Sequence, residues 1–263
     1  MSIQIHPTSF ISATAKLGEN VEIGPFCCVG DNVTLGDRVC LVSHVTVDGI
    51  TQIGDDSVVF PFVSLGHAPQ DRKYEGEPSQ LIIGKNNKIR EYVTMHAGTR
   101  GGNMITRVGD NGFFMAGVHI AHDCNIGNNV TMANYATLGG HVTIGDSAII
   151  GGLVGIHQFV RIGHSAIIGG MSAVESDVIP YAKVKGERAN LSGLNLIGLK
   201  RGDIPRTEID KLRLAYDILF DADTSTLAER ITQVAQTYRD QPRIMEIINF
   251  MTEESSRGMC LPA

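Results

Sequence analysis

The most regular feature of this 263-residue sequence is an aliphatic or similar apolar side chain at every sixth position. The series occupies Ile5, Ile11, Leu17, Ile23, Val29, Leu35, Leu41, Val47, Ile53, Val59 and Leu65, then Ile83, Ile89 and Met95, then Val108, Phe114, Ile120, Ile126, Met132, Leu138, Ile144, Ile150, Ile156, Ile162, Ile168 and Val174. A fixed period held over so many repeats indicates a solenoid, in which successive turns of the chain stack on one another.

The remaining positions of each hexad predict how the chain turns. The residue after the aliphatic one is often Gly, and the residue four places after it is small or β-branched, as at Val21 and Ala136. The residue two places after it is polar, as at Asp37 and Asp146, and an unpaired carboxylate will not enter a core. The chain must therefore bend once per hexad. Three bends close a triangle and predict a parallel β-helix with coils of 18 residues, in which each buried aliphatic side chain contributes roughly 1.5–3 kcal/mol.

Two polar segments interrupt the period, and we expect them to be loops inserted at residues 66–80 and 97–107. Inserted loops either vary freely or carry a functional site. The first loop contains Asp71 and Lys73 close together, which favours a functional role. The second contains Gly98, Gly101 and Gly102, and its role is left open.

The hexads end at Pro180, so we expect a β-helix over residues 1–180, a linker over 181–203 and an α-helical domain over 204–263. Apolar residues spaced three and four apart predict a helix over 207–220, with Thr207 as its N-cap. Further helices are expected over 224–238 and from 243 to about 254. Helices at this end would cover the open strand edge of the last coil.

Composition narrows the class of protein. Charged residues make up 19% of the chain and the net charge is −6, which argues against a nucleic-acid-binding surface. The five cysteines show no metal-binding or disulfide spacing, so we expect reduced thiols. The sequence starts without the apolar stretch of a signal peptide and contains no window long enough to span a membrane, so a soluble, cytoplasmic protein is expected.

The 18-residue coil predicts which polar residues become neighbours, because residues one coil apart lie about 4.8 Å apart in stacked strands. His122 then stacks on Gly140 and, one coil further, on Gln158, while Asp123 stacks on His141. His122 lies two places after Ile120, which is an outward position. We therefore expect one polar patch on the flank of the coil.

This patch suits base-assisted acyl transfer. A neutral histidine accepts the proton of an attacking hydroxyl or amine, a carboxylate orients the imidazole, and a glycine leaves its backbone N–H open to a developing oxyanion. The stacking column of His122 holds no Ser or Cys, and Cys124 occupies an inward position. Transfer without a covalent intermediate is the simpler interpretation. We interpret His6, His44 and His164 as solvated side chains, and His119 and His157 are left open.

Several segments together resemble one enzyme family. They are His122-Asp123-Cys124, the loop from Gln70 to Pro78, Gly140-His141, the run from Ile156 to Phe159 and the segment from Gly198 to Arg201. With the helical C-terminus, they closely resemble the acyl-carrier-protein-dependent UDP-N-acetylglucosamine O-acyltransferases of lipid A biosynthesis. The resemblance covers essentially the whole chain.

The resemblance implies a left-handed parallel β-helix with a C-terminal α-helical domain, assembled as a homotrimer with active sites between neighbouring subunits. It implies transfer of a 3-hydroxyacyl chain from acyl carrier protein to the 3-hydroxyl of UDP-N-acetylglucosamine, the first step of lipid A biosynthesis. It implies no cofactor, no bound metal, no nucleic acid and no membrane span.

The same resemblance implies a role for individual residues. His122 would be the general base, supported by Asp123, and the Gly140 N–H would bind the thioester oxyanion. The positions expected to contact the sugar or the acyl chain are Asp71, Lys73, His119, His141 and Gln158. Asn195 and Arg201 would contact the nucleotide side. Gly170 would limit acyl-chain length, and a glycine there favours a long chain.

Two departures from the family pattern leave alternatives open. The family often has a second Arg where this chain has Gly202, and a Glu where it has Ile197. A 3-amino sugar nucleotide therefore stays possible as acceptor. The N-acyltransferase of the same pathway fits less well, because the hexads begin at Ile5 and leave no room for its uridine-binding domain.

Two further readings belong to other classes of protein. A zinc hydratase on the same coil would use histidines such as His96, His119, His122 and His141 as ligands. The spacing of His119 and His122 and the Asp-Cys that follows fit it less well. A purely structural coil would not explain the polar patch and the two inserted loops.

Overall fold

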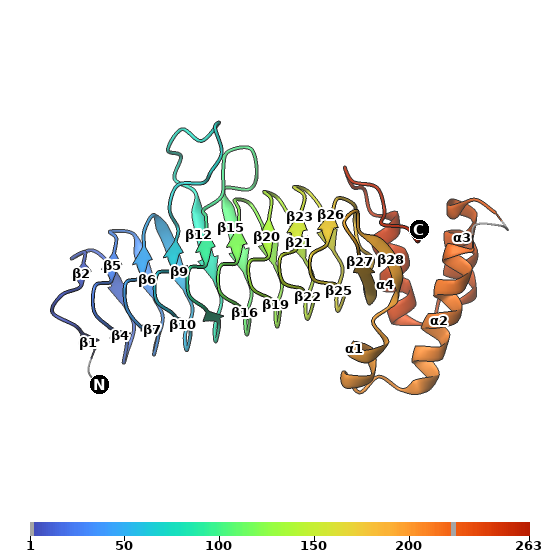
Figure 1. Cartoon of the computed structure of the whole chain (residues 1–263), viewed down its shortest axis with the longest axis horizontal. Coiled ribbons are helices and arrows are strands. Elements are labelled where there is room, and N and C mark those ends of the chain that lie inside the picture. Colours follow the sequence, from blue (N-terminus) through green and yellow to red (C-terminus); the bar gives the residue numbers. More distant parts are fainter. Residues whose placement is uncertain (1–2, 222–224) are drawn as a thin grey trace.

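The computed structural model describes residues 3–221 and 225–263, and it contains three parallel sheets wound into a left-handed parallel β-helix (Figure 1). Sheet A contains β1 (Gln4–Ile5), β4 (Glu22–Ile23), β7 (Cys40–Leu41), β10 (Val58–Val59), β13 (Lys88–Ile89), β16 (Phe113–Phe114), β19 (Thr131–Met132), β22 (Ile149–Ile150), β25 (Ile167–Ile168), β27 (Ala182–Lys185) and β28 (Asn190–Leu194).

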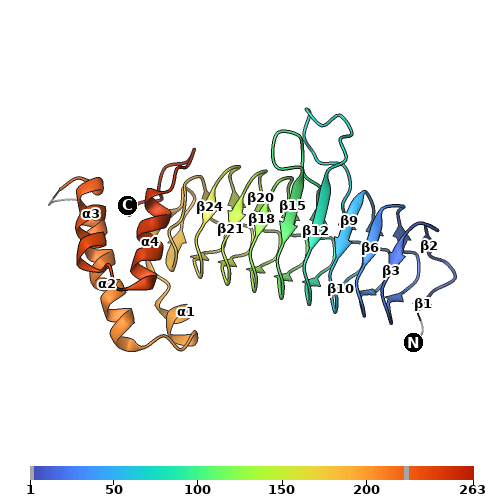
Figure 2. The ribbon, with the colours of Figure 1, turned by 180° about the vertical axis from the view of Figure 1, so that it is seen from behind.

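The other two sheets complete the triangular prism. Sheet B contains β2 (Phe10–Ile11), β5 (Cys28–Val29), β8 (Thr46–Val47), β11 (Ser64–Leu65), β14 (Thr94–Met95), β17 (His119–Ile120), β20 (Thr137–Leu138), β23 (Gly155–Ile156) and β26 (Ala173–Val174). Sheet C, which faces the viewer in Figure 2, contains β3 (Lys16–Leu17), β6 (Val33–Leu35), β9 (Ile50–Ile53), β12 (Gln80–Ile83), β15 (Ile105–Val108), β18 (Asn125–Ile126), β21 (Thr143–Ile144) and β24 (Arg161–Ile162).

The register confirms the 18-residue coil away from the inserted loops. Thr137 pairs with Gly155, and Thr143 pairs with Arg161. The sixth-position side chains lie inside the prism, where Leu65 and Ile150 are fully buried. The first coil differs, because Ile5 remains 44% exposed where no earlier coil covers it. The core is thus a stack of equivalent aliphatic layers.

The three corners of the prism have different chemistry. At the polar and apolar corners, and at Asp123, His141 and Phe159 of the loop corner, a residue with positive φ turns the chain. Asn and Asp adopt this conformation more often than other non-Gly residues. Between sheets C and A lies the polar corner, which contains Asn20, Arg38, Asp56, Asn86, Asn111, Asn129, Ser147 and Ser165. Between sheets A and B lies the apolar corner, which contains Phe26, His44, Phe62, Tyr92, Tyr135, Leu153 and Met171. Between sheets B and C lies the loop corner, which contains both inserted loops.

Asp and Asn side chains next to the polar corner have a structural role. Asp37 Oδ1 accepts a hydrogen bond from the backbone N–H of Glu19 at 2.8 Å, and Asp146 Oδ1 accepts one from Asn128 at 2.7 Å. Each side chain therefore satisfies a backbone donor of the preceding coil. At Asp55, the hydrogen bond from Lys85 and that from the Asp37 amide hold the pKa of the carboxyl below its ordinary value.

The segment 181–203, expected to be a linker, contains regular structure. β27 extends sheet A in parallel and then pairs with β28 in antiparallel orientation. The hairpin covers the edge of the last coil and blocks further parallel pairing there. α1 (Leu196–Arg201) follows, with the Asn195 side chain accepting a hydrogen bond from the Gly198 N–H at its N-terminus.

Three more helices complete the C-terminal part: α2 (Arg206–Phe220), α3 (Leu227–Thr237) and α4 (Pro242–Thr252). The Thr207 N-cap prediction is wrong, because Pro205 occupies the N-cap and Thr207 lies in the first turn. α3 begins after Thr226, which forms a capping box with Glu229, and the predicted start at Thr224 lies outside the described residues. In the described part of the chain, no helix has the length and apolarity needed to cross a bilayer.

α4 lies nearer to the coil than α2 and α3 do, and two polar contacts anchor it there (Figures 1 and 2). Arg161 of the coil pairs with buried Asp177 at 2.7 Å and with Glu253 at 2.5 Å, and its guanidinium lies over the Phe250 ring. His164 Nδ1 lies 3.3 Å from Glu246 Oε1, and the Tyr181 hydroxyl donates to the same carboxylate. His164 is therefore not the solvated side chain that the sequence suggested.

The pKa values of this pair predict a pH-dependent contribution to stability. The hydrogen bond with Glu246 raises the pKa of His164 above 6.5. Burial alone would raise the pKa of Glu246, but its bonds with His164 and Tyr181 outweigh burial and lower it. The histidine contribution is fully present below about pH 6.5 and is lost as pH rises through the raised pKa.

We expect His164→Ala to lower the thermal midpoint more at about pH 5.5 than at about pH 9. Thermal unfolding at fixed scan rate and protein concentration measures both differences. His6→Ala, whose ring forms hydrogen bonds with the neighbouring Thr8, serves as the control and should show no such difference. Equal destabilisation by His164→Ala at both pH values would contradict the pairing with Glu246.

Candidate active site at the loop corner

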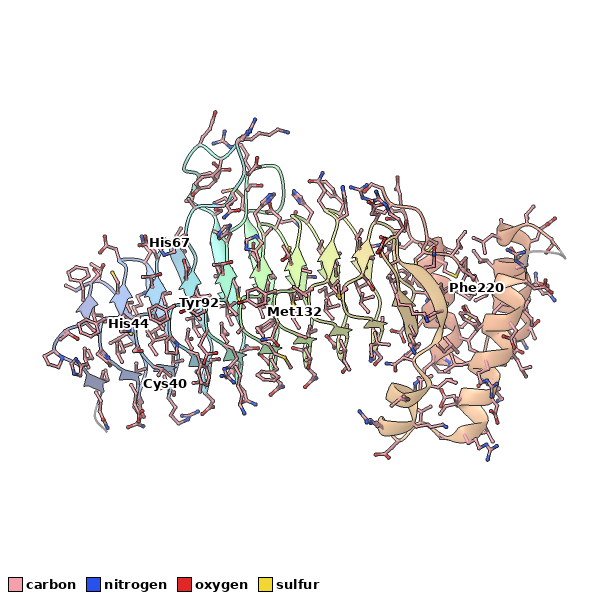
Figure 3. The ribbon with its side chains drawn as sticks, in the orientation of Figure 1. Cys40, His44, His67, Tyr92, Met132 and Phe220 are labelled. Atoms are coloured by element: carbon pink, nitrogen blue, oxygen red, sulfur yellow. The ribbon has the colours of Figure 1, made fainter. Side chains whose placement is uncertain are left out.

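Two loops project side by side from the loop corner (Figures 1 and 2). The first joins β11 to β12 and covers residues 66–79, and the second joins β14 to β15 and covers residues 96–104. The second is shorter than predicted, because Ile105 already begins β15. His67 lies where the first loop leaves the coil (Figure 3).

His122 and Asp123 follow β17 and form a direct pair. Asp123 has a φ of +59°, and this turn brings its carboxylate back toward the preceding residue. His122 Nδ1 lies 2.9 Å from Asp123 Oδ2. A carboxylate at Nδ1 favours the tautomer that carries its proton there, which leaves the Nε2 lone pair free to accept a proton.

Gly140 lies one coil further along the axis, against the His122 ring. A Cβ atom at Gly140 would lie 2.5 Å from His122 Cε1 and 2.7 Å from Nε2, so only glycine fits without displacing the ring. The adjacent amides of Gly139 and His141 donate to Ile156 O and His122 O. The Gly140 N–H has no hydrogen-bond acceptor among residues 3–221 and 225–263. The structure thus places a free backbone donor beside the imidazole.

His141 lies between His122 and Phe159. Its ring stacks on Phe159 at 4.4 Å, and its Nε2 lies 3.8 Å from Asp123 Oδ2. Burial lowers the pKa of His141, while the charges of Asp123 and Asp71 oppose that shift. At neutral pH His141 is therefore an uncharged group that either donates or accepts a hydrogen bond.

His119 lies on the outer face of sheet B beside this patch. Its Nδ1 is 2.7 Å from the Thr94 hydroxyl, and its ring meets His96 edge-on at 5.1 Å. Burial lowers the pKa of both rings, that of His96 to about 4. Both rings are uncharged at neutral pH and suit hydrogen bonding to a polar, neutral ligand.

Cys124 is a core side chain, as expected. It is 1% exposed, its thiol donates to Gly139 O at 3.2 Å, and burial raises its pKa to about 12. The thiolate is the nucleophilic form of cysteine. Cys124 therefore lacks both the access and the ionisation that a nucleophile would need.

The remaining predicted residues of this corner lie around the pair. Asp71 and Lys73 occupy the first loop, where Asp71 Oδ1 accepts a hydrogen bond from the Lys73 backbone N–H at 3.0 Å. Asp71 is near enough for its charge to act on His141. Gln158 is exposed one coil beyond Gly140 and accepts a hydrogen bond from Arg257 Nε through its backbone oxygen at 2.9 Å.

Three predicted residues lie elsewhere on the prism. Gly170 lies at the apolar corner, where a Cβ would meet Gly152 O at 3.3 Å. Asn195 and Arg201 line a cavity of about 1100 Å³ between α1, α4 and the polar corner, together with His164, Tyr181 and Glu246. Ile197 and Gly202, the two departures from the family pattern, line the same cavity. Within one chain, the predicted site is thus divided among three corners.

Sequence reasoning missed residues from the loops and the C-terminal tail that contact residues of this corner. Thr99 donates to Asp123 from the second loop, and Thr106 accepts from its backbone N–H. Arg257 belongs to the C-terminal tail, and its Nη2 lies 2.7 Å from His157 Nδ1. The hexad period says nothing about where an inserted loop or a tail folds back, so only the glycines flanking Thr99 offered a signal.

The matches to family models cover both ends of the chain. Residues 14–49 match the bacterial transferase hexapeptide model, which describes six repeats. Residues 177–260 match the second domain of UDP-N-acetylglucosamine O-acyltransferase.

Similar proteins match over nearly the full length. An acyl-[acyl-carrier-protein]–UDP-N-acetylglucosamine O-acyltransferase of Rickettsia canadensis is 50% identical over 97% of this chain and 97% of its own. The protein of that name from Caulobacter vibrioides is 50% identical over 99% and 98%. The solved UDP-N-acetylglucosamine acyltransferase of Campylobacter jejuni matches with a TM-score of 0.93 and 38% identity, over 99% of this chain and 100% of its own.

The left-handed coil, with a histidine–carboxylate pair facing a glycine amide, defines an enzyme of the hexapeptide-repeat acyltransferase class. Its full-length similarity goes further than the class. The chain belongs to the acyl-[acyl-carrier-protein]–UDP-N-acetylglucosamine O-acyltransferase family.

Proposed function

We propose that this protein transfers a 3-hydroxyacyl chain from acyl carrier protein to the 3-hydroxyl of UDP-N-acetylglucosamine, the first step of lipid A biosynthesis. The observation that carries the proposal is the His122–Asp123 pair, at 2.9 Å, with the Gly140 amide beside its imidazole. The names of the full-length relatives support the acyl donor and the sugar nucleotide.

The proposed reaction is a direct transfer. His122 Nε2 takes the proton from the 3-hydroxyl while that oxygen attacks the thioester carbonyl, and the Gly140 N–H stabilises the resulting oxyanion. The carbon–sulfur bond then breaks, and the carrier thiol leaves with the proton returned by His122. Asp123 orients the imidazole and stabilises its cation. The buried, protonated state of Cys124 supports a route without an acyl-enzyme.

Substrate contacts are assigned by position. His119, His141 and Gln158 lie beside the catalytic pair, with Asp71 and Lys73 in the loop above it, and they would contact the sugar or the acyl chain. Asn195 and Arg201 would contact the nucleotide from the cavity under α1. Gly170 would set the limit of the acyl chain, and its missing side chain leaves room for a long one.

A homotrimer would bring these separated groups together. Within one chain, the catalytic pair, Gly170 and Arg201 belong to different corners, so neighbouring subunits would have to supply the missing parts of each site. The apolar corner supports such an assembly. Phe62, Tyr92, Leu153 and Met171 are all at least 49% exposed there, and the rings of Phe62 and Tyr92 stack at 5.2 Å (Figure 3 labels Tyr92).

The same geometry would also serve a 3-amino sugar nucleotide, since His122 would take a proton from an amine as readily as from a hydroxyl. Ile197 and Gly202, which line the nucleotide cavity, are the residues that keep this alternative open. Assays with both sugar nucleotides decide between the two acceptors.

A zinc hydratase is the alternative from another class. In the described part of the chain, His122, Asp123 and His141 form the one group of potential ligands whose atoms lie within 4.8 Å. Both oxygens of Asp123 already accept hydrogen bonds from Thr99, which disfavours metal binding. Metal analysis of the purified protein tests this alternative, because stoichiometric zinc would support it.

We expect His122→Ala to lower the turnover number by roughly 10²–10⁴-fold, because proton transfer by a positioned base contributes about that factor. Mass spectrometry follows the product for several 3-hydroxyacyl carriers against both sugar nucleotides. His6→Ala, at the far end of the coil, is the matched control. Near-normal activity of His122→Ala would contradict the proposed mechanism. A wild-type protein inactive with every combination of acyl carrier and sugar nucleotide would contradict the proposed substrates.

If Gly170 limits the length of the acyl chain, Gly170→Met should shift the preference toward shorter acyl chains. The substitution should be accommodated, because the new Cβ would meet Gly152 O at 3.3 Å and Gly152 N at 3.8 Å and no further atom of the described residues within 4 Å. Competition between carriers of different chain length measures the shift. An unchanged preference, with the variant folded, would remove Gly170 from the acyl-binding region.

Shared sites predict complementation between two defective variants. Homotrimers of His122→Ala and of Arg201→Ala should both be impaired. In a mixed trimer, His122 of one subunit and Arg201 of the next would form intact sites. Mixed trimers isolated with two affinity tags should therefore exceed both parents in activity. Activity no higher than that of the better parent would place each complete site within one subunit.

A further inference from the structure

We propose that Thr99, in the second inserted loop, is a positioning residue that holds the Asp123 carboxylate against His122. The inference rests on the proposed function, because it concerns the same proton transfer. The inference also assigns a role to the second loop, which the sequence analysis left open.

Thr99 makes three contacts with the carboxylate. Its backbone N–H lies 2.9 Å from Oδ1 and 3.1 Å from Oδ2, and its hydroxyl donates to Oδ2 at 2.6 Å. Oδ2 is also the oxygen that faces His122 Nδ1. Thr99 is 2% exposed, and so is the Asp123 side chain, so these charge-assisted bonds replace water around a buried carboxylate.

The second loop is shaped for this close approach. A Cβ atom at Gly98 would lie 2.8 Å from Asp123 Oδ1, and one at Gly102 would lie 2.3 Å from its Cγ. The N–H groups of Gly102 and Met104 both donate to Thr99 O, which closes a tight turn over the carboxylate. The loop thus encloses Asp123 on the side away from His122.

The backbone of Asp123 is fixed separately. Its N–H donates to the Thr106 hydroxyl at 2.8 Å, from the first residues of β15. This bond secures the positive-φ turn that directs the carboxylate toward His122. The side chain still needs its own partners, since rotation about its bonds would carry Oδ2 away from Nδ1.

The first loop in turn supports the second. Glu77 is 7% exposed, and its carboxylate accepts the backbone N–H of Arg100 at 2.8 Å and that of Glu75 at 2.9 Å. These bonds, with that from Arg100 first, hold the pKa of Glu77 below its ordinary value. The loop that contains Asp71 and Lys73 is therefore tied to the residue next to Thr99.

The test compares Thr99→Val, which keeps the shape and the backbone N–H, with Thr99→Ser, which keeps the hydroxyl. Loss of a hydrogen bond to a charged group should lower the turnover number about ten- to a hundredfold. The Michaelis constants should change by less than about twofold, because Thr99 contacts the carboxylate and not a substrate. Thr99→Ser should restore most of the turnover.

A double-mutant cycle with Asp123→Asn separates positioning from general folding effects. Once the carboxylate is gone, Thr99→Val should cost less than about twofold in turnover. Arg100→Ala is the matched control, because it changes the adjacent exposed side chain and leaves the N–H that Glu77 accepts. Thermal midpoints of all variants report on folding.

Three results would overturn the proposal: wild-type turnover in Thr99→Val, equal losses in the wild-type and Asp123→Asn backgrounds, or no recovery in Thr99→Ser. Failure of the proposed function itself is distinguishable. If the proton-transfer mechanism is wrong, Asp123→Asn and His122→Ala would retain near-normal turnover. If the substrates are wrong, the wild type would be inactive with every pair of donor and acceptor.

Discussion

Parallel backbone hydrogen bonds between residues one coil apart determine nearly every distance in this protein. They fix the strand spacing at about 4.8 Å and bring inward side chains of equal phase into contact. Leu138 lies on Ile156 for this reason, and Gly140 lies on His122 for the same reason. The core and the contact between His122 and Gly140 therefore depend on one register. A change that slips the register would disturb both together.

The fold and part of the site could be predicted from the sequence, because the six-residue period of apolar positions determines the register of the coils. His122, Gly140 and Gln158 are spaced by whole coils, so their proximity follows from counting. The same count predicted that Asp123 stacks on His141, and His141 Nε2 lies 3.8 Å from Asp123 Oδ2. The end of the coil was less predictable, because β27 and β28 form a hairpin without the hexad pattern.

The rest of the site lies in segments where the 18-residue spacing does not predict the neighbours. Across the inserted loops the partners of a strand are no longer 18 residues apart, since Val58 pairs with Lys88 and Thr94 with His119. The path of an inserted segment depends on its own turns, so the position of Thr99 relative to Asp123 could not be predicted from the hexad period. The role of His164 was missed for a related reason, because its partner Glu246 comes from a helix distant in sequence.

Because every coil rises by the same amount, distances along the axis of the prism change by whole coils. Adding or removing whole coils changes the separation along the axis between Gly140 and the cavity near Ser165 only in steps of about 4.8 Å. An added coil before His67 would lengthen the prism and leave that separation intact. The same coil inserted between Gly140 and Ser165 would move the cavity that Asn195 and Arg201 line away from His122 by one step. Length added at the N-terminal end of the prism therefore leaves the spacing between Gly140 and the cavity unchanged, whereas length added between them does not.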